Sequence, residues 1–598
     1  MGDRSGEATT LNNIGGVYSA LGEKQKALEY YNQALPLKRA VGDRSGEATT
    51  LHNIAVMLNK QQPEVSIVFY KQSVNLYESL RKDIRKLPRK TQETYAKSVS
   101  ETYRRLADAL LAQGRIGEAQ KVMELLKIQE INTLTEGTRS PIPESQVALN
   151  QLEQEIVTKY TSLVDFGKLL YDCEQSKCSR YSEYNTQYQK LTNAYTQFIE
   201  DIKSKLAKVR SEEIERGTQD FIKSADRIIN AQPNTILIYP LVLPDKVRIL
   251  WATKGGALDQ AECPLSEAQL SKLTEDFRTA LQDSDDLNPV ETTGKKLYNC
   301  LLPEKLRTVL KTNNIENLIF VPDRSTNYLP MGALYDGKQY LIQRFAISNI
   351  LSAGLTNTDD KLQSVAKTSV LALGLTEARG KFSALPNVKS ELGAIVRQQN
   401  GTGIYPGDQY LNQAFTKTIL EDKIRGHRIL HIATHGEFKP ANPRESYFLL
   451  GNGMPYRIPD IQNLRDLKDI HLVVLSACET GLGGPDGLGL EVMGMSYFFM
   501  GDQSKAKAVM ASLWQVNDAS TSQLMQQFYQ NLATGTMSKA EALRQAQLSM
   551  IQGMRIGKAG DRGSFTITTT PTSPTTRISH NLSHPFYWAP FILIGNGL

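Results

Sequence analysis

One stretch of ten residues occurs twice in this chain, and this repetition limits the possible folds more than any other feature. The segment Gly-Asp-Arg-Ser-Gly-Glu-Ala-Thr-Thr-Leu fills residues 2–11 and recurs unchanged at residues 42–51, 40 positions later. An unchanged repeat at a fixed period is the signature of an array, in which each copy buries its apolar face against the next copy. The sequence therefore predicts stacked repeats at the start of the chain.

Small and apolar residues recur at helical spacing through residues 1–135. Two units agree at every matched position, and a third unit between them keeps part of the pattern. The matched positions are Leu11, Ile14, Gly15, Tyr18, Gly22, Ala27, Tyr31 and Ala34, then Tyr103, Leu106, Ala107, Leu110, Gly114, Ala119, Met123 and Leu126. The pattern resembles tetratricopeptide repeats (TPRs), in which small residues stand where two helices cross. The resemblance implies a concave surface for a regulatory protein or peptide, although amphipathic helices that only pack together are the alternative.

Residues 136–231 keep a helical and polar pattern, which predicts a connecting helical region. Five cysteines are spread over the chain, with no CxxC pair and no histidine at ligand spacing. We therefore expect neither a disulfide framework nor a metal site, and no cofactor. Cys173 and Cys178 could form a redox pair, but two incidental thiols in a loop are the favoured interpretation.

The charge pattern argues against nucleic acid as a partner. The formal net charge is +6, yet Lys and Arg are interspersed with Asp and Glu and form no long basic run. The first residues hold no apolar segment of a secretion signal, and the longest apolar runs fall far short of the ~20 residues that span a bilayer. We expect no membrane association and a cytoplasmic location.

The residue pattern changes after residue 232, where short apolar runs begin to alternate with helical segments. The predicted strands are 235–240, 246–252, 317–321, 369–374, 428–433, 470–477, 507–514 and 590–594, and the predicted helices include 390–399, 409–421, 519–532 and 538–551. Strands that alternate with helices are typical of a largely parallel sheet with helices on both faces. Residues 232–598 are therefore predicted to form one α/β domain.

Reactive side chains follow two successive predicted strands. His435 stands after the strand at 428–433 and before Gly436, and Cys478 stands at the end of the strand at 470–477. In open α/β sheets the reacting groups lie beyond the carboxyl ends of the strands, and neighbouring strands are about 5 Å apart. His435 could therefore take the proton of the Cys478 thiol. The ordinary pKa of a thiol, about 8.5, keeps it mostly protonated at neutral pH.

The same two loops supply donors for a negatively charged oxygen. The backbone amides of Gly436 and Cys478 are the natural oxyanion donors. The alternative is a buried structural cysteine and a loop histidine, but both residues at successive strand ends beside a glycine favour catalysis. His431 could pair with His435 on a metal, yet a packed strand histidine is the commoner outcome. The Gly-rich stretch 481–487 lacks the Lys-Ser/Thr of a phosphate loop and is interpreted as a flexible rim.

Four segments carry a family resemblance. They are His-Ile-Ala-Thr-His-Gly-Glu-Phe (431–438), Leu-Ser-Ala-Cys-Glu-Thr-Gly (475–481), Ala-Ser-Leu-Trp-Gln-Val-Asn-Asp (511–518) and His-Pro-Phe-Tyr-Trp-Ala-Pro-Phe (584–591). With them, residues 235–598 resemble a CHAT domain, a member of the caspase and separase clan of cysteine peptidases that is commonly fused to TPRs. The resemblance implies the fold class α + α/β, with TPR-type repeats before a caspase-like domain, and places the catalytic pair on His435 and Cys478. The caspase signature Gln-Ala-Cys-x-Gly is absent, which argues against cleavage after Asp.

Asp518 stands at another predicted strand end, four residues after Trp514. The segment 514–518 resembles the separase segment Leu-Trp-Asp-Val-Thr-Asp, whose final Asp recognises Arg at P1, the residue before the cleaved bond. The resemblance implies cleavage after a basic residue, preferably Arg. Because Gln515 replaces the first Asp of that segment, Glu479 or Asp486 is the candidate second acid. The alternative role of Asp518 is a helix N-cap.

The leading hypothesis is a cysteine endopeptidase that cuts a protein or peptide through a thioester, with its TPR half recruiting a substrate or a regulator. The main rival is a non-catalytic TPR-CHAT scaffold or signalling module, in which partner binding is the whole function. A third hypothesis, another thiol-dependent acyl transferase or hydrolase, keeps the chemistry and changes the substrate.

Overall fold

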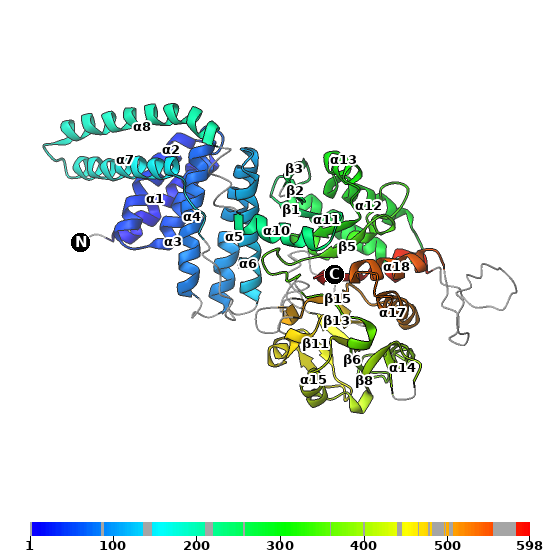
Figure 1. Ribbon diagram of the computed structural model, residues 1–598. Helices are drawn as coiled ribbons and strands as arrows, with labels where there is room; N and C mark the ends of the chain where they lie inside the picture. Colours follow the sequence, from blue (N-terminus) through cyan, green and yellow to red (C-terminus); the bar gives the residue numbers. More distant parts are fainter. Residues whose placement is uncertain are drawn as a thin grey trace. The chain divides into compact units, whose positions relative to one another are not determined.

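The structure is a computed structural model of the 598-residue chain. It describes residues 3–84, 89–134, 146–209, 219–254, 257–358, 360–398, 401–438, 445–464, 466–476, 479–480, 496, 498–500, 506–553 and 582–598. The chain divides into two compact units, Met1–Lys223 and Ser224–Leu598, which are described separately below (Figure 1).

The first unit is helical throughout its described residues. Its first six helices pair as α1 with α2, α3 with α4 and α5 with α6, which is the two-helix repeat that the sequence predicts. The helices are α1 (Arg4–Ala20), α2 (Lys24–Ala40), α3 (Arg44–Leu58), α4 (Pro63–Ile84), α5 (Arg89–Ala112), α6 (Ile116–Leu134), α7 (Gln151–Gln175) and α8 (Tyr181–Val209).

The repeated decapeptide forms the same kind of helix start in residues 3–11 and in residues 43–51. Asp3 and Asp43 each precede a helix, and their carboxylates accept hydrogen bonds from Gly6 N at 2.9 Å and Gly46 N at 2.8 Å. These bonds satisfy amide groups that the first helical turn leaves without partners. Small residues mark the crossing of the two helices, because a Cβ added at Gly15 would lie 2.7 Å from the Tyr31 ring. The unchanged sequence thus encodes helix starts in both repeats.

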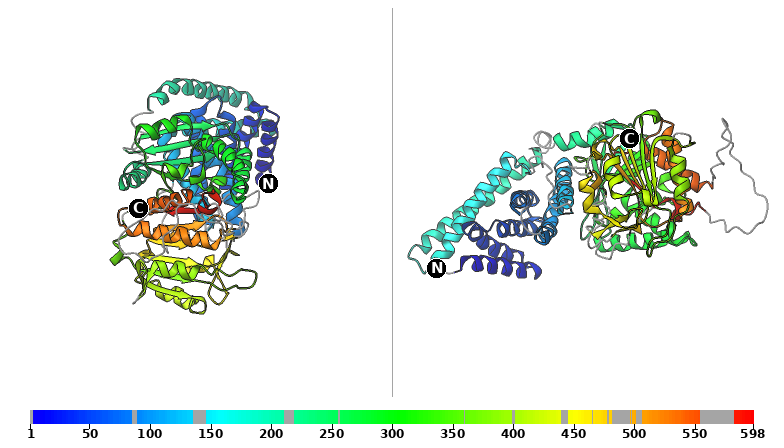
Figure 2. Two further views of the ribbon diagram at one scale, coloured as in Figure 1. Left: turned by 90° about the vertical axis from the view of Figure 1, so that its right-hand side faces the viewer. Right: turned by 90° about the horizontal axis from the view of Figure 1, so that it is seen from below.

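The long helices α7 and α8 pack against each other, and α7 also packs on α2 and α4 of the repeats (Figure 2). The Glu153 carboxylate, in the first turn of α7, accepts from Lys71 Nζ at 2.9 Å and from Arg115 Nη2 at 2.6 Å. All three side chains are buried. The predicted connecting region therefore belongs, as far as Lys223, to the same compact unit as the repeats.

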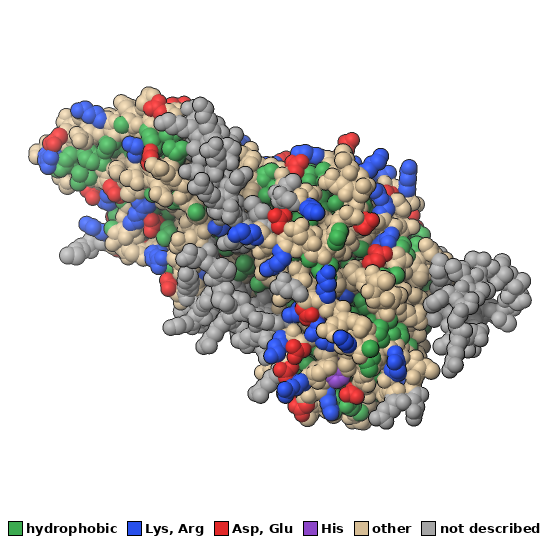
Figure 3. Space-filling model, viewed as in Figure 1, with side chains coloured by type: hydrophobic (Ala, Val, Ile, Leu, Met, Phe, Trp, Pro, Cys, Tyr) green, Lys and Arg blue, Asp and Glu red, His purple; other side chains and the backbone are tan. Residues whose placement is uncertain are grey.

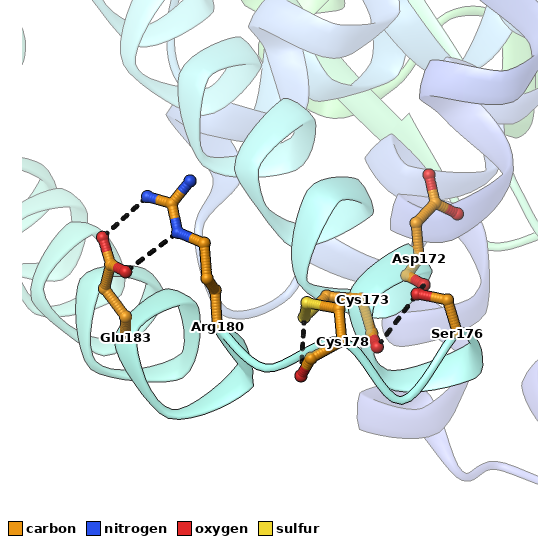
Figure 4. The surroundings of a disulfide bond; sticks show 6 residues. All are labelled: Asp172, Cys173, Ser176, Cys178, Arg180 and Glu183. Carbon is orange, nitrogen blue, oxygen red and sulfur yellow. Dashed lines mark hydrogen bonds and ion pairs between the residues drawn. A yellow bond between two sulfur atoms is a disulfide. The ribbon is translucent and has the colours of Figure 1, made fainter.

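The cysteines contradict the expectation of incidental thiols. Cys173 and Cys178 form a disulfide across the turn between α7 and α8, with their Cα atoms 4.9 Å apart (Figure 4). A second disulfide, with Cα atoms 5.2 Å apart, joins Cys263 at the end of β3 (Ala257–Cys263) to Cys300 in α12 (Asn288–Leu301). The prediction of no disulfide was wrong because it rested on spacing along the chain, whereas pairing depends on which elements the fold brings together.

The second unit contains a sheet of twelve strands among its described residues, in the order β3-β2-β1-β4-β5-β16-β15-β13-β9-β6-β8-β7. Neighbours are parallel except in the β1-β2-β3 meander and between β15 and β16. The strands are β1 (Thr235–Val242), β2 (Val247–Thr253), β3 (Ala257–Cys263), β4 (Asn317–Phe320), β5 (Ala346–Asn349), β6 (Val370–Gly374), β7 (Val396–Arg397), β8 (Tyr405–Leu411), β9 (Ile429–Ala433), β13 (Leu472–Leu475), β15 (Ala508–Ser512) and β16 (Phe591–Gly595). The largely parallel sheet confirms the predicted fold class.

Helices cover both faces of this sheet. In β9, Leu430 and Ile432 pack in a core with Leu420 of α15, whereas His431 points to the opposite face and contacts Tyr529 of α17. The helices of this unit are α10 (Gln219–Ala231, which begins in the first unit), α11 (Glu267–Gln282), α12 (Asn288–Leu301), α13 (Glu304–Thr312), α14 (Val388–Ile395), α15 (Lys417–Lys423), α17 (Asp518–Ala533), α18 (Lys539–Ile551) and α19 (Pro585–Trp588). The helix predicted at 409–421 is wrong in its first part, because residues 409–411 end β8.

A second, four-stranded sheet begins where β9 and β13 end. Its order is β12-β11-β10-β14, with β10 and β14 parallel. The strands are β10 (Gly436–Phe438), β11 (Tyr447–Leu449), β12 (Pro455–Arg457) and β14 (Glu479–Thr480). This small sheet carries the strand pairing past the point where the large sheet stops.

The distribution of surface charge and the composition of the helices relate to the expectations about nucleic acid and membranes. On the face drawn in Figure 3, Lys and Arg side chains are mixed with Asp and Glu side chains over both units. Within the described ranges, no helix combines the length and the apolarity that a bilayer span requires.

Candidate active site

His435 lies just beyond the end of β9, and its side chain is held from one side. Its Nε2 is 2.7 Å from the backbone oxygen of Ser383, and its ring stacks on Phe382 with ring centres 4.9 Å apart. Because a carbonyl oxygen only accepts, Nε2 carries the proton and Nδ1 is left as the basic nitrogen. The loop before α14 therefore sets the tautomer of His435.

Ala477 and Cys478 lie outside the described residues, but Ser476 before them and Glu479 after them are described. On one side, Ser476 N donates to Ile432 O at 3.0 Å, which extends the parallel pairing of β13 with β9. On the other side, Glu479 pairs with Glu437 in the small sheet. Both neighbours thus pair with the stretch of chain that contains His435.

A pocket opens beside His435. It has an empty volume of about 430 Å³, part of it open to solvent. Its lining residues are Leu385, Val388, Glu391, His435, Ser476, Ser512, Trp514, Gln515, Val516, Asp518 and Thr521. The described lining includes two carboxylates, on Glu391 and Asp518, and no Lys or Arg. Of these two carboxylates, that of Glu391 is buried and hydrogen-bonded inside the domain, whereas Asp518 is half-buried.

Asp518 is half-buried at the start of α17. Its Oδ2 accepts hydrogen bonds from the backbone N of Asn387 at 2.7 Å and from the Asn387 side chain at 2.8 Å. The helix N-cap is Asn517, whose side chain accepts from Ala519 N at 2.9 Å. The alternative role of Asp518 as the N-cap is therefore wrong, and its carboxylate instead joins α17 to the start of α14.

The remaining predicted site residues are described to different extents. Gly436 is buried and begins β10, where it pairs with Phe448. The backbone of Glu479 is described in β14, and its side chain is not. Asp486 lies outside the described residues.

His431 is completely buried, as predicted for a packed strand histidine. Its Nε2 is 2.8 Å from Glu391 Oε1, and its Nδ1 is 3.1 Å from the Tyr529 hydroxyl. Burial raises the pKa of Tyr529 well above its ordinary value, so this hydroxyl keeps its proton and can donate to Nδ1. The part of the chain that the structure describes holds no group of three or more His, Cys, Asp or Glu side chains suited to a metal ion.

Sequence reasoning missed Glu391 and Ser476. Glu391 Oε1 also accepts from Ser476 Oγ at 2.9 Å, so the carboxylate joins β9 to the residue that follows β13. A histidine inside a buried strand signals that some polar partner exists, because buried polar groups are almost always hydrogen-bonded. No feature of the sequence identifies that partner 40 residues earlier in the chain.

Residues 291–596 match the family model of the CHAT domain, and residues 6–79 match that of a tetratricopeptide repeat. A comparison with curated proteins returned no match. Among solved structures, the Saccharomyces cerevisiae separase–securin complex aligns at 10% identity and a TM-score of 0.39, over 100% of this chain and 47% of that chain. The chain thus spans about half the length of that relative. The Arg-specific cysteine proteinase gingipain R aligns at 11% identity and a TM-score of 0.32, over 55% of this chain and 74% of that chain.

Proposed function

Because the chain belongs to the CHAT-domain family, we propose that it is a cysteine endopeptidase with His435 and Cys478 as its catalytic dyad. The observation that carries this proposal is the strand pairing of Ser476 and Glu479, which flank Cys478 and both pair with the chain around His435. The orientation of the imidazole supports it, since Ser383 O holds Nε2–H and leaves Nδ1 to act as a base.

The proposed reaction begins when His435 Nδ1 takes the proton of the Cys478 thiol. The thiolate attacks the carbonyl carbon of the peptide bond, and the backbone amides of Gly436 and Cys478 stabilise the resulting oxyanion. The imidazolium then gives its proton to the leaving amine, and the acyl group remains on sulfur as a thioester. Water, activated by the same imidazole, releases the acid and restores the thiol.

We propose that the residue before the cleaved bond is basic, preferably Arg. Asp518 lines the same pocket as His435, with its carboxylate half-buried. A guanidinium there would form charge-assisted hydrogen bonds, whereas an acidic side chain would meet a like charge. Glu479 and Asp486 remain the second acids proposed from the sequence.

The repeats of the first unit are proposed to bind a regulatory protein or the protein substrate, as TPR arrays provide surfaces for peptides. The cytoplasm is proposed as the location. The redox state of Cys263 and Cys300 in cells tests that location, because disulfides are rare in a reducing cytoplasm.

The function is tested with the full chain, a peptide library varied at P1 and an electrophilic peptide probe. We expect cleavage after Arg, labelling at Cys478, and a loss of at least about 1,000-fold in kcat for Cys478→Ala and for His435→Ala. Asp518→Asn should lower the preference for Arg. Labelling without peptide cleavage would favour an acyl transferase or another hydrolase. If the protein is neither labelled nor able to cleave any peptide, and Cys478→Ala binds the partner as the wild type does, the scaffold hypothesis is favoured.

A further inference from the structure

One short segment, residues 382–391, contacts three separate parts of the candidate site. Its first two residues hold His435 through the Phe382 ring and the Ser383 carbonyl. Asn387, just before α14, donates two hydrogen bonds to Asp518. Glu391 accepts from Ser476, which precedes Cys478 by two positions. The general base, the proposed specificity acid and the approach to the nucleophile are thus attached to the same ten residues.

Glu391 is the most constrained member of this segment. Its side chain is 1% exposed, and its Oε1 takes hydrogen bonds from both His431 and Ser476. Among the described residues, no Lys or Arg forms an ion pair with it, and its contact with His431 is a hydrogen bond from the Nε2–H of that ring. Burying a carboxylate is costly unless hydrogen bonds compensate. The bonds from His431 and Ser476 supply this compensation for Glu391, and they fix the three side chains relative to one another.

Ser476, which is hydrogen-bonded to Glu391, stands two positions before Cys478. β13 ends at Leu475, and Ser476 is the last described residue before Cys478. Its backbone is fixed by the bond to Ile432 O and its side chain by Glu391. The chain that leads to Cys478 therefore starts from a residue held at both its main chain and its side chain.

We propose that Glu391 is a positioning residue, which holds Ser476 and thereby sets the Cys478 thiol against His435. This inference rests on the proposed dyad. A displacement of about 1 Å between reacting groups can lower a rate by about 100-fold, so the loss of one holding contact should reach the chemistry without any contact to substrate. The competing explanation is that Glu391 only satisfies His431 inside the core.

The test uses the full chain and two readouts. The first is the pH dependence of the rate at which iodoacetamide alkylates Cys478, followed by peptide mass spectrometry. The second is kcat and KM on the best peptide from the library. The variants are Glu391→Ala, Glu391→Gln, Ser476→Ala and the double variant Glu391→Ala/Ser476→Ala, with thermal unfolding measured for each. Lys389→Ala, an exposed change in the same helix, is the matched control.

We expect Glu391→Ala and Ser476→Ala each to slow alkylation at pH 7 by about 10-fold, to move its pH midpoint upward and to lower kcat more than they change KM. The double variant should be no worse than the poorer single variant, because both changes remove one contact. Glu391→Gln keeps an accepting oxygen and should restore most of the rate. Lys389→Ala should match the wild type. If Glu391→Ala does not fold, Ser476→Ala and Glu391→Gln provide the same comparison.

The outcomes separate this inference from the proposed function. A low pH midpoint that depends on His435 but is unchanged by Ser476→Ala and Glu391→Ala would overturn the positioning role and leave the dyad intact. Additive losses in the double variant would also overturn it. An ordinary thiol profile in the wild type, unchanged by His435→Ala, would overturn the dyad and the positioning role together.

Discussion

Both units of the chain bury lysine side chains, but they surround them differently. In the first unit, Lys71 lies between the carboxylates of Glu118 and Glu153, at 2.5 and 2.9 Å. In the second unit, the fully buried Lys539 has one hydrogen-bond partner among the described residues, the ring of His471 at 3.1 Å. Lys71 forms ion pairs with two carboxylates, whereas Lys539 is hydrogen-bonded to a neutral imidazole.

The surroundings of Lys539 lower the pKa of its ammonium group. Burial is the main cause that lowers its pKa to about 7, with Arg428 adding to the effect and Asp360 opposing it. Burial and the nearby Lys539 lower the pKa of His471 to about 3, so this ring is neutral at physiological pH. The comparison teaches that direct carboxylate partners compensate the burial of a lysine, and that Lys539, whose hydrogen-bond partner is a neutral ring, can lose its proton near neutral pH.

The largest effect is expected from changing pH. The unfolded chain binds the Lys539 proton below pH 10.5, whereas the folded chain binds it only below about pH 7. Between these values the unfolded state holds more protons, so the free energy of unfolding of the second unit should rise with pH, by up to about 5 kcal/mol. Lys539→Met should remove this slope and raise stability at pH 7. Urea unfolding followed by tryptophan fluorescence measures it, because all three tryptophans lie in the second unit.

Lys71→Met is the matched control for that experiment. It should destabilise the first unit, because it leaves buried carboxylates with one cation fewer, and it should leave the pH slope of the second unit unchanged. An equal slope in the wild type and in Lys539→Met, or stabilisation by Lys71→Met, would contradict the comparison.

The next effect concerns the ion network of the first unit. Glu153→Ala removes a carboxylate shared by Lys71 and Arg115 and should cost about 3 to 5 kcal/mol, since it leaves buried cations short of a partner. Hydrogen exchange of amides in α4, α6 and α7 measures the loss. Glu183→Ala is the control, because its pair with Arg180 is exposed and should contribute nothing measurable (Figure 4). Equal losses in the two variants would show that burial does not set the strength of these pairs.

The smallest effect, about 2 kcal/mol, is the expected difference between the two disulfides, one in each unit. Opening the Cys263–Cys300 bridge, which spans 37 residues, should cost about 4 kcal/mol, and opening Cys173–Cys178, which spans 5, about 2 kcal/mol. Cys263→Ser/Cys300→Ser and Cys173→Ser/Cys178→Ser are each compared with the wild type under oxidising conditions. The difference should vanish in a strong reductant. A larger loss from the shorter loop would show that native-state geometry outweighs chain entropy.

Burial explains part of how well the sequence predicted the strands, although the short, buried β5 was also missed. β9, β13 and β15 were predicted because strands buried on both faces appear as continuous apolar runs. β8 was missed because its residues, Tyr-Pro-Gly-Asp-Gln-Tyr-Leu, are mostly half-exposed and contain a proline and a glycine. Its Gly407 approaches β6 so closely that an added Cβ would lie 2.0 Å from Val370 O, a requirement that only the paired strands reveal.

In the site, separation along the chain rather than burial decided what could be predicted. His435 and Asp518 were predicted from their places after strands, and they line one pocket. The role of each remains a prediction. Glu391 could not be predicted, because its partners His431 and Ser476 lie 40 and 85 residues further along the chain. Contacts between residues so far apart depend on strand order, which local patterns do not encode.

The place of β16 in the large sheet has a consequence for how the protein is made. β16 follows every other described strand in the chain, yet it lies between β5 and β15 and joins the two halves of the sheet. During synthesis, the half that carries His435 therefore has an open edge until residues 591–595 emerge. We expect the two half-sheets to remain separate until β16 pairs with both β5 and β15. Until β16 pairs with it, β15 has an open edge, and such an edge is a template for pairing with another chain.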